Sequence, residues 1–262
     1  MRTLVLCIDG LDHRLAREFR MRSLLQEYNG VIDLSEFQQR YGRVHSLEIW
    51  HTFLTGEMPP EKLSWVTPTR LLDYSKRVAD LLGVRKVARR IAIALGLSSI
   101  LTREYKVPRA LPDLVEGSRT IGMVLYDDTR RSMRRLAKAI EKGVQAYERE
   151  AYTQFYSKRR AVLALLPEEF KLALAYIRLL DSIGHVYPRS KLKLLKAYSK
   201  VNSLVSAVRA RFSGAVMVVS DHGMDHTGMH YPEAFWSLNT KPPFHPRRVA
   251  DLHELVLKLV EA

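Results

Sequence analysis

The sequence has a single cysteine, Cys7, among its 262 residues. One thiol excludes both an intramolecular disulfide and a zinc site built from several thiolates, so any bound metal must have oxygen and imidazole ligands. Long apolar runs are missing too, because even the longest is much shorter than the roughly 18 residues of a membrane-spanning helix. We therefore expect no transmembrane anchor, and we expect Cys7 to be an inert core residue.

The first residues also lack the features of a secretory signal. Met1–Thr3 leads directly into the apolar run Leu4–Ile8, and no small-residue cleavage site follows. With 47% apolar residues, the composition is that of a globular protein and not of a disordered chain. The sequence contains no internal repeat and no low-complexity linker. We expect one cytoplasmic α/β domain spanning residues 1–262.

Charge is distributed unevenly along the chain. The sequence has 42 Lys and Arg against 28 Asp and Glu, a formal net charge of +14, and residues 70–160 contribute 21 basic and 10 acidic residues to these totals. Many of the basic residues in this middle segment, such as Arg89 with Arg90 and Arg134 with Arg135, have the spacing of solvated faces of amphipathic helices. A basic surface also attracts nucleic acid, anionic lipid and phosphorylated ligands. A polyanion partner for the middle segment therefore stays open as an alternative.

Short apolar runs of strand length alternate with segments of helical periodicity. Three of the runs end in an acidic residue and read as buried parallel strands. Two further runs, over residues 120–126 and 31–34, are candidates for additional strands. The three runs and the acids that follow them are Leu4–Ile8 with Asp9, Leu172–Leu180 with Asp181, and Ala215–Ser220 with Asp221.

Helical patterns cover residues 13–28, 130–166 and 191–212. Strands that alternate with helices form βαβ units with right-handed crossovers, so we predict a three-layer sandwich around a central, mainly parallel sheet. Residues 66–118 interrupt the alternation with three prolines and several basic helical patterns. We interpret this segment as a basic, largely helical insertion or cap within the domain.

In an open α/β sheet, ligands bind beyond the carboxyl ends of the strands, where Asp9, Asp181 and Asp221 are expected to converge. Carboxylates that lie this close repel each other unless cations are present. Histidines follow two of the acids: His185 lies four residues after Asp181, and His222 is adjacent to Asp221. Oxygen and imidazole ligands suit Zn²⁺, Mn²⁺ or iron, so these residues predict a metal site.

The order of the motifs carries further information. Asp9-Gly10 follows the first predicted strand, the segment from Ser46 to Gly56 precedes two prolines, and Asp181-x-x-Gly-His185 precedes Ser220-Asp221-His222-Gly223. This arrangement resembles the alkaline phosphatase superfamily, and within it the type I phosphodiesterase and nucleotide pyrophosphatase enzymes.

The resemblance implies an alkaline phosphatase-like fold and two divalent metals, with Zn²⁺ expected and Mn²⁺ or iron as alternatives. It also implies a phosphate-ester or nucleotide substrate, with diesters preferred to simple monoesters. By the same resemblance, Ser46 approaches the second metal as the nucleophile. The first metal would be held by Asp181, His185 and His230, and the second by Asp9, Asp221 and His222.

Similar family members place the last histidine in a Gly-x-His that follows the Ser-Asp-His-Gly motif, so the resemblance favours His230, at the end of residues 228–230, over His226 and His245. Other positions depart from the pattern of the relatives. Many of them have threonine followed by proline at the nucleophile position, whereas Ser46 is followed by Leu47 and Glu48.

The Glu48 carboxylate would put negative charge near an anionic substrate, which leaves Thr52 and Thr55 as competing nucleophiles. Where relatives have His-Gly after the proline, this chain has Lys62-Leu63.

Two classes of function therefore compete. The first is a metal-dependent phosphohydrolase that acts through a covalent Ser46 intermediate. The second is a polyanion- or nucleic-acid-binding protein with a weak or relic metal site. A relic site would be expected to have lost at least one ligand, and all six expected ligands are present, so we favour the enzyme.

Overall fold

A computed structural model describes residues 1–61, 63, 107, 109–127 and 130–262. Most of the predicted insertion, with Arg89 and Arg90, lies outside these residues, and its extent stays a prediction. The described end of that segment packs with the rest of the domain: Val107, Ala110 and Leu111 are buried in an apolar cluster shared with the sheet.

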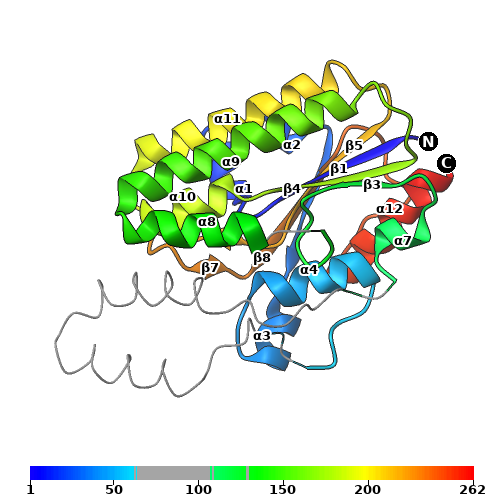
Figure 1. Ribbon diagram of the computed structural model, residues 1–262. Helices are drawn as coiled ribbons and strands as arrows, with labels where there is room; N and C mark the ends of the chain where they lie inside the picture. The colour runs from blue at the N-terminus through cyan, green and yellow to red at the C-terminus, as the bar shows by residue number, and fades with distance from the viewer. Residues whose placement is uncertain (62, 64–106, 108, 128–129) are drawn as a thin grey trace.

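A six-stranded sheet forms the centre of the molecule, in the order β2-β8-β5-β1-β4-β3 (Figure 1). β1 pairs in parallel with β4 and β5, and β3 pairs in parallel with β4. β8 is antiparallel to both of its neighbours, β5 and β2. The prediction of a mainly parallel sheet is confirmed. The strands are β1 (Thr3–Ile8), β2 (Tyr28–Asp33), β3 (Arg119–Ile121), β4 (Leu172–Ile177), β5 (Ala215–Ser220) and β8 (Glu233–Leu238).

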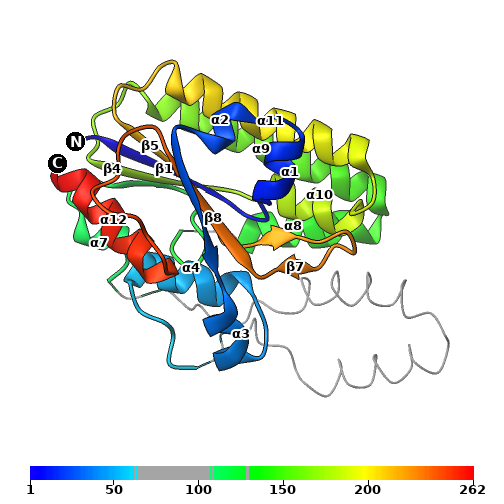
Figure 2. The same ribbon diagram turned by 180° about the vertical axis from the view of Figure 1, so that it is seen from behind.

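Helices cover both faces of this sheet and complete three layers (Figures 1 and 2). One face carries α1 (His13–Glu18), α2 (Arg22–Leu25), α8 (Arg130–Glu141), α9 (Val144–Leu165), α10 (Leu179–Val186) and α11 (Lys191–Arg209). The other face carries α3 (Ser35–Tyr41), α4 (Ser46–Thr55), α7 (Leu111–Leu114) and α12 (Val249–Glu261).

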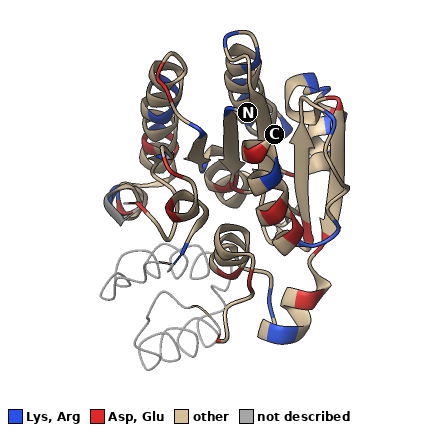
Figure 3. Cartoon of the chain, turned by 90° about the vertical axis from the view of Figure 1, so that its right-hand side faces the viewer, with Lys and Arg blue, Asp and Glu red and all other residues tan. Residues whose placement is uncertain are grey.

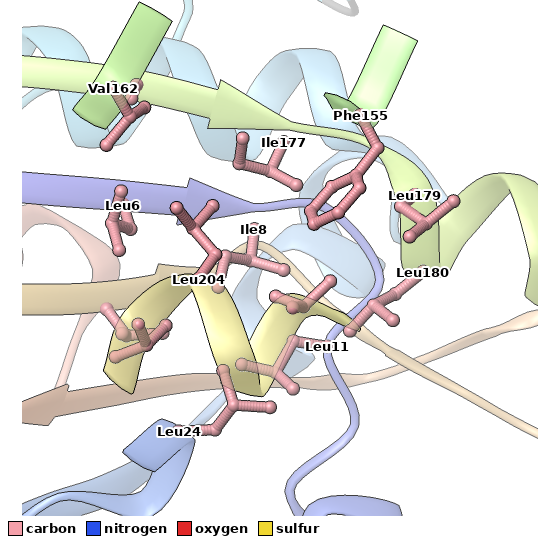
Figure 4. Close-up of a cluster of buried hydrophobic side chains, with 14 of the residues drawn as sticks. Leu6, Ile8, Leu11, Leu24, Phe155, Val162, Ile177, Leu179, Leu180 and Leu204 are labelled. Carbon is pink, nitrogen blue, oxygen red and sulfur yellow. The ribbon is translucent and has the colours of Figure 1, made fainter. Parts of the chain in front are cut away.

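Alternation along the central strand explains the two layers. In β1, Leu6 and Ile8 belong to the core cluster under α9 and α11, whereas Val5 and Cys7 belong to the cluster under α4 and α12. Figure 4 shows Leu6 and Ile8 beside Leu204 of α11. All six residues of β1 are buried, as expected for a strand covered on both faces. Cys7 is buried, in agreement with its predicted place in the core.

Three predicted elements have different bounds. The strand predicted over residues 172–180 ends at Ile177, and α10 begins at Leu179. The strand predicted over 120–126 ends at Ile121, because Gly122 has a left-handed φ of +60° and its N–H donates to Asp127. The long helix predicted over 130–166 is interrupted at Gly143, whose φ is +104°.

The helix predicted over residues 13–28 is also divided, into α1 and α2, and its last residue already belongs to β2. Arg20, between the two helices, has a left-handed φ of 56°. Among the helices that the structure describes, none has the length and apolar character needed to cross a lipid bilayer.

Candidate metal centre

The candidate site lies at the carboxyl ends of the central parallel strands. Asp9 directly follows β1 and Asp221 directly follows β5. Asp181 lies in the first turn of α10, and its N–H donates to the carbonyl oxygen of Asp9 at 3.1 Å. Gly10 makes this approach possible: it has a φ of +72°, and a Cβ on it would lie 2.8 Å from the Cα of Asp181.

Asp181, His185 and His230 form one cluster, called here the Asp181 group. One ligand atom from each of these residues lies within 4.8 Å of the others. Oδ1 of Asp181 is 2.9 Å from Nε2 of His185 and 3.8 Å from Nε2 of His230. The residues come from α10 and from β7 (His230–Tyr231), which pairs with β6 (Gly223–Met224) in a small hairpin. The hairpin therefore brings His230 to the end of α10.

Asp9, Asp221 and His222 form a second cluster, the Asp9 group, whose ligand atoms also lie within 4.8 Å of one another. Nε2 of His222 is 3.3 Å from Oδ1 of Asp9 and 3.4 Å from Oδ2 of Asp221. All three residues are buried. The rings of His222 and His230 stack with their centroids 3.6 Å apart, so the two groups are direct neighbours.

The three histidines share one orientation. Each ring places Nδ1 near a backbone carbonyl oxygen: His185 near Gly228 at 2.9 Å, His222 near Gly223 at 2.9 Å, and His230 near Val44 at 3.3 Å. A carbonyl oxygen only accepts hydrogen bonds, so a neutral ring at each position carries its proton on Nδ1. The lone pair of Nε2 then points into the group, which is the arrangement of metal-binding histidines in proteins.

One oxygen of each carboxylate is buried without a hydrogen-bond donor among the described residues: Asp9 Oδ1, Asp181 Oδ1 and Asp221 Oδ2. These are the oxygens that face the imidazole Nε2 atoms. A buried charged oxygen without a partner is costly, and a divalent cation would remove that cost. The donor set of carboxylate oxygens and imidazole nitrogens therefore fits a divalent metal in each group.

The pKa values reflect the crowding of negative charge in the Asp9 group. Burial, and then repulsion from Asp9, raises the pKa of Asp221 to about 7. Burial would lower the pKa of His222, but attraction to Asp221 and Asp9 outweighs it and raises that pKa to about 10. In the Asp181 group, burial and the nearby His222 hold the pKa of His230 well below its usual value. His230 is therefore neutral at physiological pH.

Ser46 begins α4 beside the Asp9 group. Its Oγ is 3.1 Å from Nε2 of His222. His45 is the N-cap residue of this helix, and Nδ1 of its ring lies 3.0 Å from Oε2 of Glu48. The structure therefore places the predicted nucleophile at the start of a helix, where free N–H groups favour an anion.

Glu48 does not present its charge to this site. Its carboxylate is buried, with Arg43 at 3.1 Å and Nδ1 of His45 at 3.0 Å. Burial opposes ionisation of Glu48, but the hydrogen bonds from His45 and Arg43 outweigh it and lower the pKa. The competing threonines are engaged within the helix: Thr52 donates to the carbonyl oxygen of Glu48 at 2.8 Å, and Thr55 donates to that of His51 at 2.9 Å.

The two alternative histidines lie apart from the groups. His226 and His245 are exposed, and neither belongs to a cluster of possible ligands found in the described residues. Of the three candidates considered from the sequence, only His230 lies beside Asp181 and His185.

Two residues at the site were missed by sequence reasoning. Arg178 places Nε 3.1 Å from Oδ2 of Asp181 and 3.8 Å from Oδ2 of Asp9. The hydroxyl of Tyr176 donates to Oδ2 of Asp9. Both residues stand at the junction of β4 and α10, just before the Asp181 motif, and that position is the one signal in the sequence that could have identified them.

Comparisons with known proteins identify the family and the fold of this chain. The profile of the family "Type I phosphodiesterase / nucleotide pyrophosphatase" matches residues 65–241, which include Asp181, His185, Asp221, His222 and His230. No curated protein matches the sequence.

Solved structures similar to this chain include alkaline phosphatase from the Antarctic bacterium TAB5, with 9% identity, a TM-score of 0.51 and coverage of 99% of this chain and 97% of that chain. A variant of the same enzyme with Mg bound in its M3 site has 9% identity, the same coverage of both chains (99% and 97%) and a TM-score of 0.54. These structures share the alkaline phosphatase-like fold. Because the family profile matches more than half of the chain, the protein belongs to the type I phosphodiesterase/nucleotide pyrophosphatase family and is a phosphoester hydrolase.

Proposed function

We propose that this protein hydrolyses phosphodiesters or nucleotide pyrophosphates with Ser46 as the nucleophile and two divalent cations as cofactors. One observation carries the proposal: two groups of three ligand atoms lie side by side, with the Ser46 hydroxyl next to one of them. The preference for diesters and nucleotides follows the family to which the chain belongs.

The Asp181 group would hold one cation and the Asp9 group the other. Three nitrogen and oxygen ligands from the protein suit catalytic Zn²⁺, whose fourth ligand is usually water or substrate, and the same donors also accept Mn²⁺ or iron. The similar alkaline phosphatase variant contains Mg, which supports a metal-dependent site in this fold. Bound cations would neutralise the charge of the phosphate oxygens and lower the pKa of a hydroxyl beside them.

In the proposed reaction, deprotonated Ser46 Oγ attacks phosphorus and forms a new P–O bond. The bond from phosphorus to the leaving-group oxygen breaks, and that oxygen departs with the electron pair and takes up a proton. A water molecule then attacks the phosphoryl-serine, and the bond between phosphorus and Ser46 breaks as Ser46 regains a proton. Each displacement inverts phosphorus, so the two steps together give retention.

The N-terminus of α4 supports this reaction in two ways. The helix fixes the Ser46 backbone, and its first N–H groups and dipole favour a phosphate beside the hydroxyl. Glu48, the one carboxylate of this helix, forms an ion pair with Arg43 and a hydrogen bond with His45. The site therefore accepts an anionic substrate in spite of an acidic residue two positions from the nucleophile.

Metal analysis of the purified protein, combined with assays on bis-(p-nitrophenyl) phosphate and p-nitrophenyl phosphate, tests this proposal. We expect two equivalents of metal and faster hydrolysis of the diester. Ser46→Ala should lose several orders of magnitude in rate while it keeps its metal. Thr55→Ala, which removes a hydroxyl from the same helix, is the matched control and should keep its activity.

Trapping the intermediate tests the covalent step directly. Mass spectrometry after rapid acid quench should find phosphorus on the peptide that contains Ser46. A fully active Ser46→Ala protein, or inversion of a chiral phosphorothioate substrate, would show that water attacks directly.

The described residues offer no observation that favours the alternative of a polyanion-binding protein. In the part of the chain coloured by charge, Lys and Arg are spread over several elements and alternate with Asp and Glu (Figure 3). Arg135, from the basic middle segment, forms an ion pair with Glu150 at 2.8 Å. Nucleic-acid binding and a cytoplasmic location therefore stay predictions from the sequence.

A further inference from the structure

We propose that Arg178 is a positioning residue that couples the two metal groups. The proposal rests on the proposed function, because it assigns Arg178 a task in holding the ligands of two cations. It differs from that function in its content: it predicts that one side chain outside both groups controls the metal affinity of each.

The place of Arg178 in the fold explains its reach. It directly follows β4 and is the residue that precedes α10. Ile177, the last residue of β4, pairs with Ile8, the last residue of β1. The side chain of Arg178 therefore begins at the junction between the strand that leads to Asp9 and the helix that carries Asp181.

In both Asp181 and Asp9, the two carboxylate oxygens have different surroundings. Arg178 Nε donates to Oδ2 of Asp181 at 3.1 Å and lies 3.8 Å from Oδ2 of Asp9. Tyr176 donates to the same Oδ2 of Asp9. The other oxygen of each carboxylate, Oδ1, is buried without a donor and faces the imidazoles of its group. Arg178 thus engages the outer oxygen in both groups and orients the inner one towards a cation.

Arginine suits this position because it is a permanent cation among several buried carboxylates. Its side chain is only 26% exposed. Met133 of α8 contacts the guanidinium, and Phe155 and Gln154 of α9 line the small cavity that Arg178 borders. The hydrogen bond to Asp181 holds the side chain in place before a cation arrives.

Polar groups behind the ligands of a metal typically contribute about 10- to 100-fold to its affinity. Arg178 contacts one carboxylate of each group, so its loss should weaken both metals. Loss of a ligand, in contrast, should abolish only its own site. This difference separates a residue that couples the groups from one that belongs to either of them.

The test uses the full-length protein and competition with a chromophoric chelator, which reports the affinity of each Zn²⁺ or Mn²⁺ equivalent without any assay of activity. Arg178→Gln should weaken both equivalents by about 10- to 100-fold. Arg178→Lys keeps the charge without the planar fork and should recover part of the loss. Arg160→Gln, which neutralises an exposed arginine of α9, is the matched control and should bind as the wild type does.

Background variants assign each equivalent to its group. His230→Ala leaves the Asp9 group alone, and His222→Ala leaves the Asp181 group alone. Adding Arg178→Gln to each background should weaken the remaining site in both cases. Circular dichroism of the metal-free proteins verifies that every variant is folded, and Arg178→Lys serves as the second variant if Arg178→Gln does not fold.

Three results would overturn the proposal. Unchanged affinity of both sites in Arg178→Gln would show that Arg178 does not position ligands. Weakening in only one background would assign it to a single group. Tighter binding would mean that repulsion between the guanidinium and the cations exceeds the benefit of orientation. A wild-type protein that binds no metal would instead refute the proposed function, so the two failures are distinguishable.

Discussion

The two metal groups are built from different parts of the fold. The Asp9 group stands at the ends of two central strands, is fully buried and contains two carboxylates and one imidazole. The Asp181 group stands on a short helix and a hairpin, and its two imidazoles are partly exposed, with side chains 22% and 20% accessible. The buried, more negative group has the greater need for a cation, whereas the other is the more open to exchange. We expect the Asp9 group to bind its metal more tightly and the Asp181 group to exchange it faster.

The largest effect is expected from removing a carboxylate of the Asp9 group. Asp221→Ala deletes one of its two negative ligands, so it should lose one metal equivalent and nearly all activity. Metal analysis and diesterase assays measure both quantities. Glu141→Ala, at an exposed carboxylate at the end of α8, should change neither. An active Asp221→Ala protein with two metals would refute the assignment of this group.

His230→Ala should affect only the more open group. It removes one of two imidazoles, so the exchangeable equivalent should be lost while the buried one stays. Dialysis against a weak chelator, followed by metal analysis, separates the two. His226→Ala changes an exposed histidine of the same loop and should keep both metals. If His226→Ala loses the exchangeable metal and His230→Ala keeps it, the choice of the late ligand is wrong.

The two groups should also differ in the number of protons that they release when a cation binds. This effect should be of intermediate size. The pKa of His222 is raised to about 10, so at pH 8 its ring carries a proton that must leave when a cation binds. In the Asp181 group, His230 has a lowered pKa and has no such proton to lose, and Asp181 raises the pKa of His185 by less than the pKa of His222 is raised. Metal binding to the Asp9 group should therefore release about one proton at pH 8 from its histidine, and its affinity should rise with pH up to about 10.

Calorimetric titration of the His230→Ala protein in two buffers of different ionisation enthalpy measures that release. Below pH 7 the release should increase, because the pKa of Asp221 is raised to about 7 and its proton must also leave. Equal release from the His222→Ala protein at pH 8 would contradict this difference between the groups.

The smallest effect is expected at Glu48, which adjoins the site but belongs to neither group. Glu48→Gln keeps the shape and loses the charge that pairs with Arg43 and His45, so it should lower the free energy of unfolding by about 1–3 kcal/mol and leave both metals bound. The pKa of Glu48 is lowered below its ordinary value of 4.5 in the folded protein. Its stabilisation is therefore fully present above that ordinary value and is lost as the pH falls through the folded pKa.

Urea unfolding of wild type and Glu48→Gln at pH 7 and at pH 3 measures this dependence. The difference between the two proteins should be larger at pH 7. A difference that grows on acidification would show that the carboxylate is not held in its charged form.

The sequence predicted the strand ends well where an acidic residue directly stops an apolar run, as at Asp9 and Asp221. It placed the end of β4 too late, because Leu179 and Leu180 continue the apolar run although they already belong to a helix. Periodicity over so few residues does not separate a buried strand from the first turn of a buried helix. The prediction that Asp181 lies near the other acids was nevertheless correct, since the helix starts at the same edge of the sheet.

The sequence did not predict the side-chain contacts between segments that are distant along the chain. Arg178 is a single arginine with no pattern around it, and its contact with Asp9 depends on the register of β1 and β4. The negative charge of Glu48 is balanced by Arg43, which lies in the preceding loop. In both cases the sequence displays a charge, and only the packed structure shows which partner it has.

The antiparallel direction of β8 has a consequence for how such a site can be changed. β5 ends and β8 begins at the same edge of the sheet, so the chain between them is a short return loop and not a crossover around the domain. Residues 221–232 make up that loop, and it holds Asp221, His222 and His230, half of the candidate ligands. Half of the candidate metal ligands therefore lie in one continuous loop, which is held at both ends by the paired strands β5 and β8. Such a segment could be exchanged between related proteins in one piece, to alter metal preference while the sheet stays as it is.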